Sequence, residues 1–118
     1  MEYREEKIGD VLIIRILQPR LDTDIAPELK TEILRLIEQV GEHRILIDLK
    51  EVDYVDSSGL GALLFAARQT KAKSGMLRLV NSNQKFLNLI RIAKLDSVIV
   101  NYNNEGKAIK SFQEEYEQ

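Results

Sequence analysis

Two patterns of apolar residues alternate along this chain. Short runs rich in branched residues, at 11–17, 45–49, 76–80 and 98–102, have the length and composition of buried strands. Between these runs, apolar residues recur at helical spacing with charged residues on the other side, as in amphipathic helices. Strands that alternate with helices predict a mostly parallel sheet with right-handed crossovers.

Residues that favour turns, helix caps and helix ends mark the boundaries of these elements. They are Gly9-Asp10 as a hairpin turn after a first strand at 3–8, Asp22-Thr23-Asp24 as the cap of the next helix, Pro27 in its first turn, Gly41 at its end, Asn81-Ser82-Asn83 as the cap of a short helix, and Asn103-Asn104-Glu105-Gly106 as the entry to a C-terminal helix. The predicted fold class is α/β, with a mixed, mostly parallel β-sheet of about five strands covered by about four helices.

The segment Asp56-Ser57-Ser58-Gly59 follows the 45–49 strand after a short polar connection and begins the next predicted helix. Aspartate and serine readily satisfy the free backbone N–H groups of a first helical turn. Functional sites of open α/β sheets lie past the carboxyl ends of strands, which makes this helix start the candidate site. The positive end of the helix dipole would also accept a phosphate on a serine.

The two serines also have a purely structural interpretation, because serine commonly caps a helix by bonding the N2 or N3 amide. Two observations favour a further role. A cap needs one hydroxyl, and here there are two. Gly61 costs up to about 1 kcal/mol in a helix interior relative to alanine, which suggests that the sheet or a partner protein approaches the helix closely. Phe65 is displaced from the face formed by Leu60, Leu63 and Leu64, so part of this helix could stay uncovered for a partner.

The sequence argues against an enzyme. A serine nucleophile needs a base within reach, and His43, the one histidine, precedes the 45–49 strand that the serines follow, well over about 15 Å away. The chain has no Gly-x-Ser-x-Gly and no Walker motif. We expect no catalytic residue, no metal site and no cofactor, although a loosely held nucleotide at the helix terminus stays open.

Acidic residues stand before two of the predicted helices. Asp22, Asp24, Asp53 and Asp56 are expected to be caps or solvated loop charges. Asp22 and Asp56 follow strands that should be neighbours, so they could flank one pocket around Ser57. Two carboxylates there could place a magnesium-bound phosphate, but they would repel a phosphate left on the serine.

Composition narrows the class of protein further. The 118 residues fit one domain over 1–118, and 44% hydrophobic with 31% charged residues allows a core and a polar surface. A formal net charge of −2 gives no attraction to nucleic acid or to anionic membranes. The chain lacks cysteine, an apolar run near the ~20 residues that span a bilayer, and a signal-peptide core at its charged N-terminus. We therefore expect a cytoplasmic protein.

The motif Asp56-Ser57-Ser58-Gly59-Leu60-Gly61 after an apolar strand resembles the signature of STAS domains, and specifically of bacterial anti-sigma-factor antagonists. Residues 21–26 are similar to the Leu-Asp-x-x-x-Ala segment that precedes the first helix of this family. Pro19 stands where the family often has a glycine just before that segment. The resemblance runs along the whole chain and implies a STAS-like single domain.

The resemblance also implies a binding module that a kinase modifies. In this family the unphosphorylated antagonist binds an anti-sigma factor serine kinase and thereby frees the sigma factor. Phosphorylation of one serine blocks the binding, and a PP2C-like phosphatase restores it. The acceptor position matches Ser57. The partner-binding positions that follow from the resemblance are Asp22, Thr23, Asp56, Ser57, Ser58, Gly59, Leu60 and Gly61.

A second class of function stays open. Similar domains act as non-switching scaffold subunits of stress-signalling assemblies or as accessory subunits of lipid transport systems. In such a protein the Ser-Ser-Gly segment would be mostly a cap. We expect a monomer or weak dimer in either case.

Overall fold

A five-stranded sheet forms the centre of the computed structural model, which describes residues 1–117. Its strands are β1 (Tyr3–Ile8), β2 (Val11–Ile16), β4 (Arg44–Asp48), β6 (Met76–Val80) and β7 (Asn101–Tyr102), in the spatial order β1-β2-β4-β6-β7. β1 is antiparallel to β2, and all other neighbours are parallel. The prediction of a mixed, mostly parallel sheet is confirmed.

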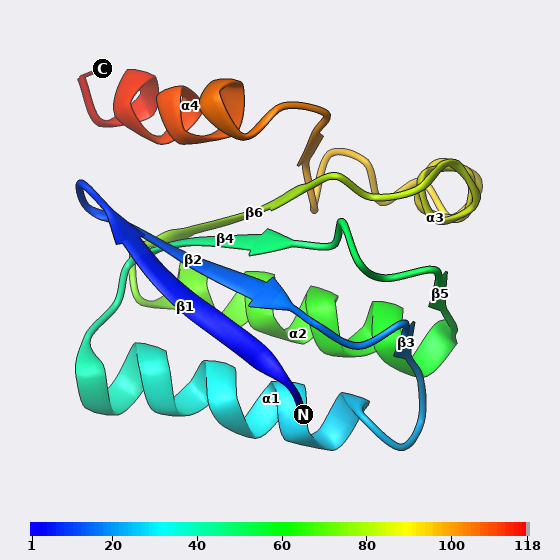
Figure 1. Ribbon diagram of the computed structural model, residues 1–118. Helices are drawn as coiled ribbons and strands as arrows, with labels where there is room; N and C mark the ends of the chain where they lie inside the picture. The colour runs from blue at the N-terminus through cyan, green and yellow to red at the C-terminus, as the bar shows by residue number, and fades with distance from the viewer. Residues whose placement is uncertain (118) are drawn as a thin grey trace.

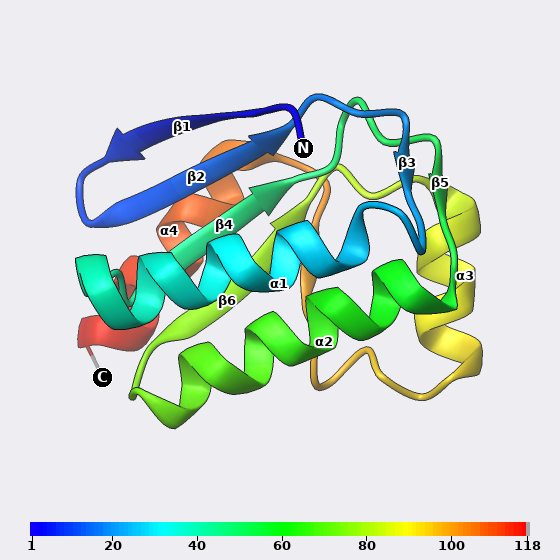
Figure 2. The same ribbon diagram turned by 90° about the horizontal axis from the view of Figure 1, so that it is seen from below.

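Helices cover both faces of this sheet (Figure 1). On one face, α1 (Ala26–Arg35) continues into a π-helical turn, η1 (Leu36–Val40), and lies beside α2 (Ser57–Ala72) (Figure 2). α4 (Glu105–Glu117) lies over the other face, and α3 (Gln84–Ile92) lies near the end of the sheet where α2 begins. These four α-helices match the predicted number, and none of them in residues 1–117 is both long and apolar enough to cross a membrane.

The core lies in two layers because side chains of a strand alternate between its faces. Leu12, Ile14 and Ile16 of β2 belong to the larger cluster on the α1 and α2 side. Val11 and Ile13 belong to the smaller cluster, which Ala108 and Phe112 of α4 cover. A strand that is buried on both faces reads as a continuous apolar run, which is why β2 and β4 stood out in the sequence.

The last strand is shorter than the sequence indicated. In place of a strand over 98–102, only Asn101 and Tyr102 pair with β6. The backbone N–H groups of Val98 and Ile99 both donate to the carbonyl of Leu95 at 3.0 Å, so the chain turns there. Ile99 is 1% exposed and anchors this turn in the core, whereas its neighbours Val98 and Val100 are exposed.

The predicted cap of α1 is wrong. Ile25 occupies the N-cap position without a side-chain cap. The Asp22 carboxylate accepts instead from the Asp24 N–H at 3.1 Å, and the Asp22 carbonyl accepts from the Ala26 N–H at 2.8 Å. Asp22 therefore shapes the loop before the helix. Gly41, with a φ of +84°, ends the helical segment as predicted.

A second, two-stranded parallel sheet was not predicted. It pairs β3 (Arg20–Leu21) with β5 (Tyr54–Val55) beyond the carboxyl ends of β2 and β4. The loop before α1 and the start of α2 leave these two strands side by side (Figure 1). This small sheet thus brings the two candidate segments of the sequence together.

Candidate functional site

α2 begins directly after β5, and its side-chain cap is Asp56. The Asp56 backbone is extended, and its carboxylate accepts the N–H of Gly59 at 2.9 Å. The Asp56 carbonyl also accepts the N–H of Leu60 at 2.9 Å. The helix is therefore capped without either serine, so the interpretation of Ser57 and Ser58 as cap residues does not hold.

The two serines differ in their surroundings. Ser57 is the first residue of α2 and is exposed. Its hydroxyl makes no hydrogen bond with the described residues. Ser58 is half-buried, and its hydroxyl oxygen lies 3.2 Å from that of Thr23 in the loop before α1. Ser57 alone thus presents an unengaged nucleophilic oxygen at the positive end of the helix.

The glycine of close approach is Gly59, not Gly61. A Cβ placed on Gly59 would lie 2.2 Å from the carbonyl oxygen of Leu21 and 2.9 Å from Val55 Cγ1. A Cβ on Gly61 would meet nothing within 4 Å. The backbone of β3 therefore approaches the helix, and it does so at Gly59, two residues before the position that we expected.

The apolar side chains of α2 are largely covered. Leu60 is 8% exposed and Leu63 fully buried, while Leu64 packs against the core. Phe65 is half-buried, with the Lys30 ammonium of α1 5.6 Å from its ring centroid. Leu64 and Phe65 are therefore the only apolar side chains at 60–65 that stay partly accessible, and Leu60 and Leu63 contribute nothing to an accessible surface.

The predicted partner-binding residues divide by accessibility. Thr23 and Ser57 are exposed, and Asp22, Asp56, Ser58 and Gly61 are half-buried. Gly59 and Leu60 lie in the interior. The structure brings these positions together through the pairing of Leu21 with Val55 and the bond from the Asp56 N–H to the Leu21 carbonyl (3.2 Å).

The carboxylates of Asp22 and Asp56 serve their own segments. Asp22 accepts from the Arg20 guanidinium at 3.3 Å as well as from the Asp24 N–H, and Asp56 holds the Gly59 N–H. Across the described residues, no group of three or more histidine or carboxylate side chains is arranged for a metal ion. His43 is exposed and precedes β4, at the opposite end of that strand from the serines.

Sequence reasoning missed two contacts of the segment that leads to the serines. Tyr54 is 45% exposed, and the Arg20 guanidinium lies 4.5 Å from its ring centroid. Asn83 caps α3 by accepting the Phe86 N–H at 2.9 Å and also donates to the Asp53 carbonyl at 2.8 Å. Asn83 was predicted only as a cap, whereas it also fixes α3 against the connection that leads to Ser57.

The groups with shifted pKa lie away from this helix start. Burial, followed by the hydrogen bond to Glu32, raises the pKa of Tyr3 to about 12. The Arg35 guanidinium lowers the pKa of the Glu32 carboxyl. Hydrogen bonds to Glu105, Glu6 and Asp48 raise the pKa of Arg15. The hydrogen bond of Tyr3 joins β1 to α1, and those of Arg15 join β2 to β1, β4 and α4.

Comparison with known proteins agrees with the fold and with the motif at α2. The family model of the STAS domain matches residues 3–108. The anti-sigma-B factor antagonist of Bacillus subtilis (strain 168) is 33% identical over 87 residues, which are 73% of this chain and 78% of that protein.

Solved structures show the same fold. The crystal structure of an anti-sigma factor antagonist from Mycobacterium paratuberculosis has a TM-score of 0.82 and 20% identity, and covers 95% of this chain and 93% of its own. The phosphorylated form of the Bacillus cell fate determinant SpoIIAA has a TM-score of 0.72 and 22% identity, over 93% of this chain and 98% of its own. The family resemblance of the sequence is confirmed: this chain belongs to the STAS domain family, among the anti-sigma-factor antagonists.

Proposed function

We propose that this protein binds an anti-sigma factor serine kinase, and that phosphorylation of Ser57 ends this binding. The observation that carries the proposal is the exposed Ser57 hydroxyl at the first position of α2, which the helix cap leaves unused. The names of the relatives support the class of partner. A solved relative in a phosphorylated form supports the modification.

A phosphate on Ser57 can be received without unfolding the helix. It adds about −1.5 to −2 charge where the helix dipole is positive. Asp56 occupies the N–H groups of Gly59 and Leu60. The N–H groups of Ser57 and Ser58 have no acceptor among the described residues, so they remain free for phosphate oxygens.

The switch then acts locally. The phosphate would stand beside the Asp56 carboxylate on a surface that also contains Thr23 and Ser58. A kinase that packs on this surface would meet added bulk and negative charge, which weakens the complex by repulsion and desolvation. A PP2C-like phosphatase would restore the original surface.

The partner contact divides into two roles. Thr23, Ser57, Ser58 and Gly61 are accessible and would touch the kinase, while Asp22 and Asp56 hold the two loops in place. The buried pair Gly59 and Leu60 would position the helix start against β3 and the core.

The test is intact mass and phosphosite mapping after incubation with ATP and the serine-kinase anti-sigma factor of the same organism. We expect one added phosphate that is lost in Ser57→Ala and retained in Ser58→Ala. Ser57→Asp should bind the kinase more weakly than the unmodified protein. Absence of phosphate with every such kinase would refute the switch and favour the non-switching scaffold, and phosphate retained in Ser57→Ala would refute Ser57 as the acceptor.

A further inference from the structure

Charge is divided unevenly along this chain. Residues 57–100 contain seven lysines and arginines and one carboxylate, Asp96, so this span carries a formal charge of +6. Because the whole chain carries −2, the remaining residues carry −8. The small net charge of the chain is therefore the sum of an acidic part and a basic region, which consists of α2, β6, α3 and the turn before β7.

Arg78 of this region is engaged with the Met76 sulfur and the Phe112 ring, but the other six basic side chains form no ion pair with a described side chain. The ion pairs found among the described side chains, such as Lys7 with Glu42 and Arg15 with Asp48, join residues outside 57–100. Lys71, near the end of α2, forms no ion pair with a described side chain. An exposed, unpaired cation of this kind is available to an acidic partner.

The same region contains an open sheet edge. β7 pairs with β6 only at Leu79 and Val80, because the chain turns at residues 95–99. The Met76 N–H donates toward β4, to the His43 carbonyl at 2.7 Å, while the Leu79 N–H donates toward β7, to the Val100 carbonyl at 2.9 Å. Because successive N–H groups of a strand alternate in direction, the N–H and carbonyl of Leu77 point to the open side.

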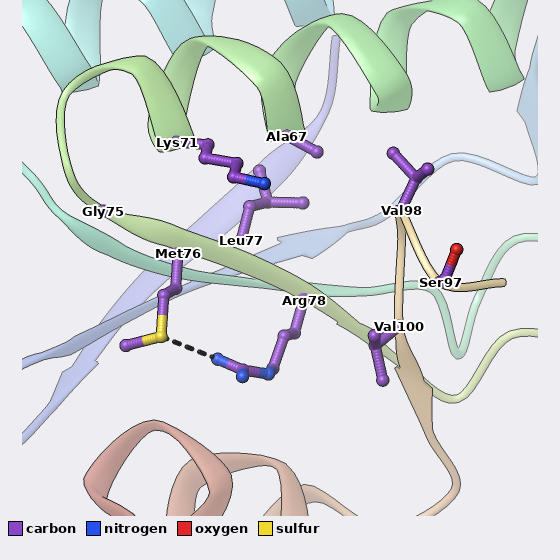
Figure 3. Close-up of a pocket in the computed structure, with 9 residues that line it drawn as sticks. All are labelled: Ala67, Lys71, Gly75, Met76, Leu77, Arg78, Ser97, Val98 and Val100. Atoms are coloured by element: carbon purple, nitrogen blue, oxygen red, sulfur yellow. Dashed lines mark hydrogen bonds between the residues drawn. The ribbon is translucent and has the colours of Figure 1, made fainter. Parts of the chain in front are cut away.

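A groove of about 320 Å³ runs along this edge (Figure 3). Ala67 and Lys71 of α2 form one wall of the groove, and Val98 and Val100 of the turn before β7 form another. Val98 is 44% and Val100 is 37% exposed. In Figure 3 the Lys71 side chain extends from α2 toward the Leu77 side chain of β6. Unpaired backbone, aliphatic walls and a cation therefore meet in one place.

We propose that this β6 edge groove binds an extended acidic peptide segment of a partner protein, which adds as a short strand beside residues 75–77. Strand addition to an exposed edge takes its affinity from main-chain hydrogen bonds and its specificity from pockets for alternate side chains. The backbone of Leu77 supplies the hydrogen bonds, the valines take aliphatic side chains, and Lys71 with the surrounding positive charge selects carboxylates. An extended peptide fits better than a nucleic acid, since the free groups of Leu77 match those of a peptide backbone.

This site is separate from the proposed switch. Ser57 and Lys71 lie near opposite ends of α2, which at 1.5 Å per residue places them about 20 Å apart. A peptide in the groove would leave the Ser57 surface accessible. The protein could therefore hold one partner at each end of the same helix, and failure of either proposal would leave the other standing.

The test is a titration of the full-length, ¹⁵N-labelled protein followed by NMR. The probe is an acetylated and amidated octapeptide of alternating valine and glutamate, compared with the same peptide carrying lysine in place of glutamate. We expect saturable shifts at 75–77 and 97–100 and slower hydrogen exchange of the Leu77 amide with the acidic peptide only. A version of the acidic peptide that is N-methylated at alternate residues should bind more weakly, because it cannot complete the strand.

Charge-reversal variants separate the groove from the general basic surface. Lys71→Glu should weaken binding about fivefold or more, since it replaces an attraction by a repulsion. Lys85→Glu makes the same change on α3, outside the groove lining, and should stay within about twofold of the unmodified protein. Spectra of the free variants verify that both remain folded.

Three results would overturn the proposal. The first is equal binding of the valine–lysine peptide, or no saturable shift with the acidic peptide. The second is the same set of shifts on concentrating the protein alone, which would assign the edge to a second copy of this chain. The third is tighter binding of a single-stranded oligonucleotide at these residues, which would assign the basic region to nucleic acid.

Discussion

Replacing each of two glycines of α2 by alanine should change stability in opposite directions. A methyl group on Gly59 would lie 2.2 Å from the Leu21 carbonyl oxygen and 2.9 Å from the Leu21 carbonyl carbon. Both are backbone atoms of β3, which cannot rotate away as a side chain could. A methyl group on Gly61 would have nothing within 4 Å. The two positions lie in the same first turns of the same helix, so Gly61→Ala is a matched control.

The magnitudes follow from two opposing terms. Alanine stabilises a helix interior by about 1 kcal/mol relative to glycine, and this term applies at both positions. Overpacking against a rigid neighbour costs about 1–3 kcal/mol, and this term applies only at Gly59. Since the Gly59 clash involves backbone, we expect the upper part of that range. Gly59→Ala should therefore lose about 1–2 kcal/mol, and Gly61→Ala should gain about 0.5–1 kcal/mol.

Urea unfolding followed by circular dichroism measures both changes. With a slope of about 1–3 kcal/mol per molar urea, the midpoints of the two variants should differ by about 1 M, on either side of the unmodified protein. Gly59→Ala should also shift the backbone NMR signals of Leu21 and Val55. If Gly59→Ala proved as stable as Gly61→Ala, the contact between α2 and β3 would not be the constraint described here.

Four further substitutions test the cap and the pH dependence. Asp56→Ala should lower the free energy of unfolding by about 1 kcal/mol because it removes the N-cap. Ser57→Ala should leave it unchanged within about 0.5 kcal/mol. Equal losses in urea unfolding would contradict the assignment of Asp56 as the cap. The lowered pKa of Glu32, caused first by Arg35, gives stability that is present above about pH 4.5 and lost as the pH falls through the folded-state pKa. The raised pKa of Tyr3, about 12 and caused first by burial, gives stability that is full below about pH 10 and lost as the pH approaches 12. The midpoint temperature of thermal unfolding, measured against pH, should therefore fall less steeply in acid for Glu32→Gln and less steeply in alkali for Tyr3→Phe than for the unmodified protein. The same pH dependence in the variants as in the unmodified protein would refute these two assignments.

Local patterns were enough to predict most of the fold. The branched runs became β2, β4 and β6 because strands buried on both faces need continuous apolar side chains. The apolar run at 98–102 misled because Ile99 is buried in a turn, and burial alone does not distinguish a turn from a strand. Hydrogen bonds to the Leu95 carbonyl decide that difference, and they leave no periodicity in the sequence.

The position of the candidate segment at a helix start was predicted from the sequence, but its contacts were not. The Asp-Ser-Ser-Gly segment at a helix start was visible, since these residue types favour such a start. Asp56 is the cap and Ser57 keeps a free hydroxyl because the backbone of Asp56 is extended. The helix and cap propensities of these residues do not predict which of them takes the cap position. The role of Gly59 depends on the carbonyl of Leu21, a residue distant in sequence. Such contacts become apparent only when β3 and β5 are seen to pair.

The small sheet of β3 and β5 has a consequence for how such proteins can diverge. The loop with Thr23 and the start of α2 rest on this two-stranded sheet, whose hydrogen bonds are separate from the ladder of the five-stranded sheet. Substitutions at the exposed positions of these two segments would therefore disturb few bonds of the main fold. A cell that keeps several proteins of this architecture could give each its own partner by changing these segments alone, and crosstalk between parallel signalling routes would be limited by a few surface residues.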